Sequence, residues 1–165
     1  MTASPGRQSL SPVSVNVSLP HTWDHIRQIR TKVGDALKDA NPSLRSAAVM
    51  VTSELVENAV KYGEDVRAAP QIGVALEIGP DTIVIRVRNG SADERAVGAL
   101  KQRVDEIMSA PDKSVLYLAR LEELMAEPTE TGRLGLYRIA FEGEFDIAFS
   151  YVNQVVTMTA TRNYQ

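Results

Sequence analysis

The sequence predicts an α+β fold, a two-layer sandwich in which helices cover one face of a mixed β-sheet. Apolar and polar residues alternate near the start, in the middle and at the end of the chain, as in half-buried strands. Other stretches carry apolar residues every three or four positions, as amphipathic helices do. The predicted strands and helices are grouped, which favours separate layers over regular βαβ alternation.

The composition indicates one domain. The chain has 165 residues, of which 44% are hydrophobic, enough for a single core. A net charge of −3 gives nucleic-acid binding little electrostatic support, and the absence of cysteine excludes disulfides and thiolate metal sites. Because no apolar stretch approaches ~18 residues, we expect no membrane span and a cytoplasmic location. Residues 1–12, which contain several Ser and Pro, are expected to form a disordered tail before a domain over 13–163.

The first half of the domain is expected to contain one strand and two helices. Valines alternate with Ser and Asn over residues 13–19, which predicts a strand. Apolar residues in steps of three and four from 23 to 37 predict a helix that ends near residue 40. Asn41 is a good N-cap, Pro42 suits a first helical position and Gly63 suits a C-cap, so a second helix is expected between them.

The second half is expected to open with a hairpin over residues 72–87, because the turn residues 79–81 separate two alternating stretches. Residues 92–127 return to helical spacing, with a break at Pro111. A polar loop, a short helix and two strands are expected next, over residues 127–133, 134–141, 145–151 and 154–161.

A polar stripe interrupts the second predicted helix. Glu54 and Asn58 are four residues apart, so their side chains are neighbours on one face. A carboxylate and an amide oxygen can hold a hydrated Mg²⁺, and the carboxylate can instead accept a proton from a hydroxyl. The alternative is a solvated face with a Glu57–Lys61 ion pair, and spacing alone favours that alternative.

Glycines mark two further candidate positions. Residues 132–136, Gly-Arg-Leu-Gly-Leu, stand where a loop is expected to become a helix, and free N–H groups there attract phosphate. Arg133 could add a bidentate phosphate contact. An ordinary loop-to-helix junction remains the alternative. Gly90 follows Asn89 at a predicted strand end, where a simple turn is the usual outcome.

Taken together and in this order, the motifs resemble those of the GHKL ATPase family, which has the Bergerat fold. Residues 53–63 resemble the N box with its E-x-x-x-N-A core, and residues 85–90 resemble the first glycine box. Residues 132–140 resemble the G-x-G-L-G-L box and its helix. The resemblance covers residues 13–161. Its compact size and the helical stretch 92–127 look like anti-sigma serine kinases, closest to the SiaB-type switch kinases.

The resemblance implies ATP and Mg²⁺ as cofactors and a role for each matched residue. It makes Asn58 the Mg²⁺ ligand and Glu54 the general base toward a substrate hydroxyl, with Lys61 facing phosphate. Asn89 stands where most members carry an adenine-binding Asp. The other positions implied around the nucleotide are Gly90, Gly132, Arg133, Leu134 and Gly135.

Two functions remain open at this stage. The first is an ATP-dependent protein serine kinase, an anti-sigma regulator that phosphorylates a STAS-domain partner. The second is a weak or inactive module of the same fold that sequesters a STAS partner or a sigma factor. Glu54 and Asn58 favour the first, whereas Thr131 and Arg133, which replace family glycines, favour the second. The resemblance also implies a homodimer, and residues 92–127 are either a lid over the nucleotide or a helical pair fixed on the core.

Overall fold

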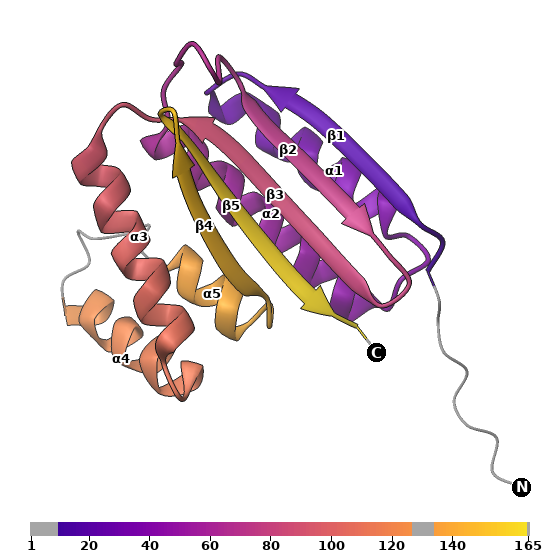
Figure 1. Ribbon diagram of the computed structural model, residues 1–165. Helices are drawn as coiled ribbons and strands as arrows, with labels where there is room; N and C mark the ends of the chain where they lie inside the picture. The colour runs from indigo at the N-terminus through magenta and orange to yellow at the C-terminus, as the bar shows by residue number, and fades with distance from the viewer. Residues whose placement is uncertain (1–9, 127–133, 165) are drawn as a thin grey trace, which may run out of the picture.

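The computed structural model describes residues 10–126 and 134–164, which form five strands, five α-helices and a short 3-10 helix (Figure 1). The strands are β1 Val13–Leu19, β2 Ile72–Ile78, β3 Thr82–Gly90, β4 Asp146–Val152 and β5 Val155–Asn163. The helices are η1 Trp23–His25, α1 Ile26–Ala36, α2 Pro42–Tyr62, α3 Glu94–Ser109, α4 Lys113–Ala126 and α5 Gly135–Phe141.

The strands form one sheet in the order β1-β2-β3-β5-β4, and all four neighbouring pairs are antiparallel. The expectation of a mixed sheet is therefore wrong. The reason is the position of β5. Strand β4 runs parallel to β3, but β5 inserts between them, pairs with both and removes the parallel contact. The predicted hairpins appear as β2–β3 and β4–β5.

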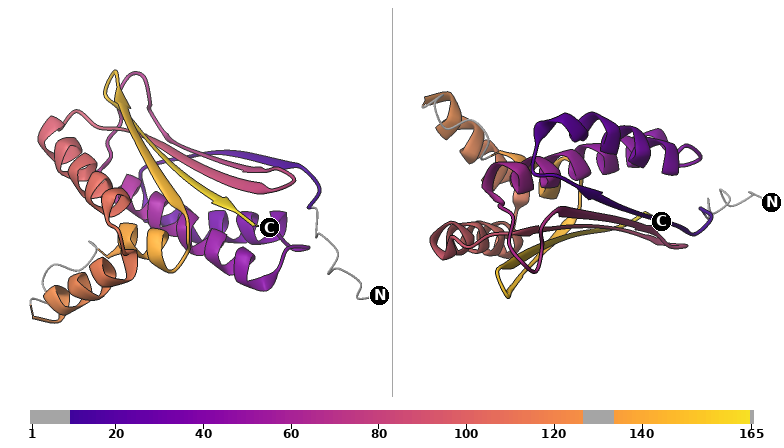
Figure 2. Two further views of the ribbon diagram at one scale, coloured as in Figure 1. Left: turned by 60° about the horizontal axis from the view of Figure 1, so that its bottom comes forward. Right: turned by 90° about the horizontal axis from the view of Figure 1, so that it is seen from above.

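Helices α1, α2 and α5 cover one face of the sheet, which confirms the two-layer α+β sandwich (Figure 2). Helix α2 lies centrally between α1 and α5 and buries its predicted stripe of Leu44, Ala48, Val51, Leu55 and Ala59. The predicted last member of that stripe, Tyr62, is 43% exposed. Buried Thr52 and Ser53 also lie on α2, and each hydroxyl donates to the carbonyl four residues earlier at 2.8 Å.

The ends of α1 and α2 show how local chemistry sets helix boundaries. Asn41 caps α2 as expected, because its Oδ1 accepts a 2.8 Å hydrogen bond from the Ser43 N–H. Gly63 ends α2, but with an extended backbone at φ −87° instead of the left-handed turn typical of glycine caps. A Cβ at Gly63 would collide with the Ala59 carbonyl oxygen, so close packing requires this glycine. Helix α1 begins at Ile26, after a 3-10 turn in which Trp23 is 57% exposed.

The two helices within 92–127 differ in burial. Helix α3 lies beyond the β4 edge of the sheet and buries Val97, Val104 and Ile107. Helix α4 projects from the body and has no buried residue (Figure 2). Its contact with the rest of the chain is mainly with α5, where the Tyr117 and Phe141 rings lie 4.7 Å apart. The loop expected over 127–133 lies outside the described residues, as do residues 1–9 of the expected tail; Leu10 packs against the core.

No helix in the described ranges combines the length and the apolar character needed to cross a bilayer.

Candidate functional site

Helix α2 separates two openings in the surface and contributes side chains to both. Glu54 lines a groove between α1 and α2, whereas Asn58 lines a pocket between α2, β3 and α3. We call these the α1–α2 groove and the α2–α3 pocket. The two residues that the sequence placed on one face are therefore one helical turn apart, and each contributes to a different opening.

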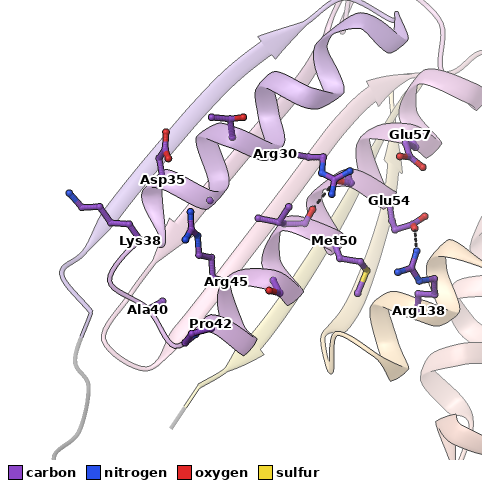
Figure 3. Close-up of a pocket in the computed structure, with 15 residues that line it drawn as sticks. Arg30, Asp35, Lys38, Ala40, Pro42, Arg45, Met50, Glu54, Glu57 and Arg138 are labelled. Atoms are coloured by element: carbon purple, nitrogen blue, oxygen red, sulfur yellow. Dashed lines mark hydrogen bonds and ion pairs between the residues drawn. The ribbon is translucent and has the colours of Figure 1, made fainter.

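The α1–α2 groove has a volume of about 740 Å³, and Figure 3 shows its charged walls. Glu54, Glu57 and Arg138 lie toward one end, and Lys38 and Arg45 toward the other. The groove is lined by Arg30, Thr31, Gly34, Asp35, Lys38, Ala40, Pro42, Arg45, Ser46, Val49, Met50, Ser53, Glu54, Glu57 and Arg138.

Glu54 is held by a short network of ionic contacts. Its Oε1 accepts a 2.8 Å hydrogen bond from Arg138 Nη1 of α5. Arg138 Nε donates to Glu142 at 2.9 Å, and the Tyr117 hydroxyl of α4 donates to the same carboxylate at 2.6 Å. The network therefore runs from α4 through α5 to the candidate base on α2.

The pKa of Glu54 lies above its ordinary value of 4.5, chiefly because burial penalises the charged carboxylate. Glu57 raises it further, and Arg138 opposes the rise. The Glu54 side chain is 18% exposed, so water solvates it only in part. A carboxylate with a raised pKa is a stronger proton acceptor, which is the property that a general base requires.

Gly135 brings the start of α5 against Glu54. A Cβ at this position would collide with Glu54 Oε2, so a larger residue would require the Glu54 carboxylate to move from its place beside Arg138. Leu134 is the N-cap residue of α5 and makes no side-chain cap, so the first N–H groups of the helix have no partner from that side chain. The structure thus brings the Leu134–Gly135 segment to the predicted base. Gly132 and Arg133 lie outside the described residues.

The α2–α3 pocket brings Asn58 and Asn89 together. Its volume is about 170 Å³. Apolar side chains form most of its wall, and its polar members are Asn58, Asn89, Ser91 and Arg103. Such a wall, apolar with a few polar groups, suits a flat heterocyclic ring.

Asn89 is buried, and its orientation leaves an acceptor available. Its Nδ2 donates to the Gly90 carbonyl at 3.1 Å, and within the described ranges no group donates to its Oδ1. An amide oxygen can accept the amino hydrogen of adenine. Gly90 itself has a packing role, because a Cβ there would collide with Val66 and with the Glu64 carbonyl oxygen.

The volume and the polar residues of the α2–α3 pocket can be compared with what Mg-ATP requires. About 170 Å³ is below the ~300–1,000 Å³ of most ligand pockets, so the space suits the base better than the whole nucleotide. No cluster of three or more His, Cys, Asp or Glu capable of holding a metal occurs among the described residues. Mg²⁺ bound through phosphates and water needs only one or two protein oxygens, so Asn58 suffices chemically. The residues present therefore suit the base and one metal ligand, whereas the space as it stands is smaller than a whole nucleotide needs.

Lys61 lines neither opening, and the same holds for the predicted site residues Gly90, Leu134 and Gly135. Lys61 lies on the exposed end of α2, with its Nζ 5.1 Å from the centroid of the Tyr62 ring. The expected contact of Lys61 with phosphate stays a prediction.

The sequence alone missed Arg138, Arg103 and Ser91. Arg138 stands within the segment that resembles the last glycine box, but nothing in its spacing indicates a contact with Glu54, 84 residues away. Ser91 follows the Asn89-Gly90 pair directly, which is the one local signal that could have identified it. Arg103 lies on the polar side of α3, and its place in the pocket depends on how α3 packs.

Comparison with known proteins establishes the fold. A scan of the sequence against models of protein families finds no match, and a search of curated proteins finds none. Among solved structures, the chain is similar to the crystal structure of the RsbU and RsbW domains of Rv1364c from Mycobacterium tuberculosis, with a TM-score of 0.54 and 18% identity. The match covers 93% of this chain and 33% of that chain, so this chain spans about a third of its neighbour's length.

Proposed function

We propose that this protein is an ATP-dependent serine kinase that regulates a partner-switching pathway by phosphorylating a STAS-domain protein. One observation carries the proposal: α2 places an ionisable, half-buried Glu54 against Gly135 and, one turn later, Asn58 in a pocket with Asn89. The likeness in fold to a protein with RsbU and RsbW domains supports a role in anti-sigma regulation.

In this mechanism, Mg-ATP supplies the phosphoryl group, and Mg²⁺ offsets charge on the phosphate oxygens. Asn89 and the apolar wall of the α2–α3 pocket would hold the adenine, and Asn58 would offer its oxygen to the metal. Glu54 accepts the proton of the partner's serine hydroxyl. Arg138 holds the Glu54 carboxylate through the 2.8 Å contact, which fixes the direction in which the base points.

Calorimetry with Mg-ATP tests the nucleotide site. Wild type is expected to bind, and Asn58→Ala is expected to bind at least roughly tenfold more weakly because a metal ligand is lost. Glu57→Ala is the matched control, since Glu57 lies on the same helix and does not line the α2–α3 pocket. Absence of binding in wild type at millimolar ATP would eliminate the kinase.

A second experiment tests the base. Glu54→Gln is expected to bind Mg-ATP like wild type but to transfer no measurable phosphate to a STAS-domain partner, because the amide cannot accept the proton. Transfer at the wild-type rate by Glu54→Gln would remove the catalytic role of Glu54.

The small volume of the α2–α3 pocket favours a second candidate, a module that binds a partner without phosphorylating it. Asn89 also favours it, because the neutral amide forms a weaker hydrogen bond to adenine than a carboxylate, a loss of about 1 kcal/mol. Stable binding of a STAS partner or a sigma factor without Mg-ATP binding would support this second candidate over the kinase.

A further inference from the structure

We propose that the α1–α2 groove binds an extended, acidic segment of a partner protein, oriented with a hydroxyl-bearing residue at the Glu54 end. The placement of the hydroxyl rests on the proposed kinase function. The preference for acidic residues rests on the charges of the groove itself and stands independently of catalysis.

Three cations line the groove without an acidic partner among the described residues. Arg30, Lys38 and Arg45 are exposed and line the groove, and none forms a salt bridge with any residue that the structure describes. Among the described lining residues, Asp35 is the acidic one on the side of Lys38 and Arg45, whereas Arg30 lies nearer to Glu54 and Glu57 (Figure 3). Carboxylates of a bound segment can therefore form ion pairs with these cations without displacing an existing ion pair.

The groove is also shaped to admit a chain. Gly34 of α1 lies opposite Arg45, and a Cβ at Gly34 would stand 3.4 Å from Arg45 Nη2. The missing side chain at Gly34 leaves room for the Arg45 guanidinium beside α1. The volume of about 740 Å³ lies within the ~300–1,000 Å³ range of established ligand sites.

The distribution of charge along the groove sets the direction of the segment. Glu54 and Glu57 lie toward one end, where they offset the charges of Arg138 and Arg30, so this end attracts acidic residues of a ligand less than the other end does (Figure 3). Lys38 and Arg45 lie toward the other end and attract them. The same two glutamates disfavour a polyanion along the full groove, which argues for a polypeptide with a neutral hydroxyl residue followed by acids over a nucleic acid.

The position of Glu54, the candidate base, is also consistent with a substrate segment bound in the α1–α2 groove. The Glu54 carboxylate opens to the α1–α2 groove, whereas Asn58 opens to the α2–α3 pocket on the other side of α2. A nucleotide and an acceptor therefore approach from different sides. Under the proposed kinase function, transfer would take place at Glu54, against which the start of α5 lies.

A pair of synthetic peptides tests the proposal on the full chain. One peptide carries a serine next to a run of glutamates, and its control carries glutamines in their place. The glutamate peptide is expected to shift the amide resonances of α1 and α2 in NMR titrations and to bind at least about tenfold more tightly than the control, with an affinity that falls as salt is added.

Charge variants locate the site. Arg45→Glu is expected to weaken binding of the glutamate peptide by about tenfold or more, and the milder Arg45→Gln to weaken it in the same direction. Lys32→Glu is the matched control, because Lys32 is exposed on α1 and lies outside the groove. Equal loss with Lys32→Glu, equal affinity for the glutamine peptide or shifts confined to other elements would overturn the proposal.

The outcomes also separate this proposal from the kinase. A peptide that occupies the groove, but whose serine stays unphosphorylated in the presence of Mg-ATP, supports the groove and counts against the kinase. If the protein binds Mg-ATP but the peptide does not shift the resonances of the groove residues, the proposed nucleotide site stands and the proposed peptide site is wrong.

Discussion

At the scale of single residues, Glu54 balances two opposing effects. Burial disfavours its charge, and the Arg138 guanidinium at 2.8 Å favours it. The raised pKa shows that burial dominates. Neighbouring Glu142 behaves in the opposite way, because the hydrogen bond from Tyr117 lowers its pKa. The two carboxylates that contact Arg138 therefore have pKa values that are shifted in opposite directions.

This difference predicts a pH dependence of stability. Between 4.5 and the raised pKa of Glu54, the folded chain binds a proton that the unfolded chain has lost, so stability decreases as pH rises through this window. Glu54→Gln removes this dependence. The free energy of unfolding of wild type, measured relative to Glu54→Gln by urea denaturation, should therefore increase as pH falls from neutral toward 4.5. A difference that is constant or changes in the opposite direction would contradict the burial effect.

The contact between Arg138 and Glu54 predicts how the pH dependence of phosphotransfer changes when Arg138 is replaced. Without its guanidinium, the pKa of Glu54 should rise further, because the main effect opposing burial is lost. In phosphotransfer assays, Arg138→Gln should therefore move the acidic limb of the pH profile to higher pH, and Arg138→Lys should restore most of it. Thermal stability should change by only about 1 kcal/mol, since the ion pair is partly exposed. An unmoved limb would show that Arg138 has no effect on the base.

At the scale of elements, glycines in different positions predict opposite effects on stability. Gly63→Ala should destabilise the chain by about 1–3 kcal/mol, because the new Cβ meets the Ala59 carbonyl and lies 2.7 Å from Asn89 Nδ2. Gly98→Ala should stabilise it by about 0.5–1 kcal/mol, because Gly98 lies inside α3 with nothing within 4 Å of an added Cβ. Equal effects in chemical denaturation would show that close packing at Gly63 is not what requires glycine.

The elements themselves were largely predictable from sequence. Asn41 and Pro42 fix the start of α2, and the alternating residues of β2 and β3 fix their hairpin. The burial of Thr52 and Ser53 was not predictable, because their hydroxyls are satisfied by carbonyls of their own helix. The contact between Glu54 and Arg138 joins α2 to α5 across a long stretch of sequence, and no local pattern encodes it.

At the scale of the whole molecule, helix packing predicts where motion occurs. Helix α4 buries no side chain, so its amides should exchange hydrogen faster than those of α2. Because the α2–α3 pocket is small for a nucleotide, binding of Mg-ATP should change exchange in α3, and Asn58→Ala should abolish that change. Hydrogen-exchange mass spectrometry checks both. Unchanged α3 exchange at saturating nucleotide would remove the lid interpretation of residues 92–127.

The whole-molecule arrangement was also the hardest part to predict. The two layers follow from the grouping of strands and helices, but the strand order does not follow from any single stretch. Glu54 and Asn58 were expected to share one cleft, since they are four residues apart. The packing of α1 on one side of α2 and α3 on the other gives them separate openings.

The place of β5 in the sheet has a consequence for synthesis on the ribosome. Residues 155–163 leave the exit tunnel after the other four strands that the structure describes, yet they lie between β3 and β4 and pair with both. Until they emerge, the nascent sheet is missing an interior strand, and the edges of β3 and β4 that β5 will cover have unpaired backbone groups. The translated chain therefore cannot close its sheet stepwise, and it must wait for β5 to fill the gap.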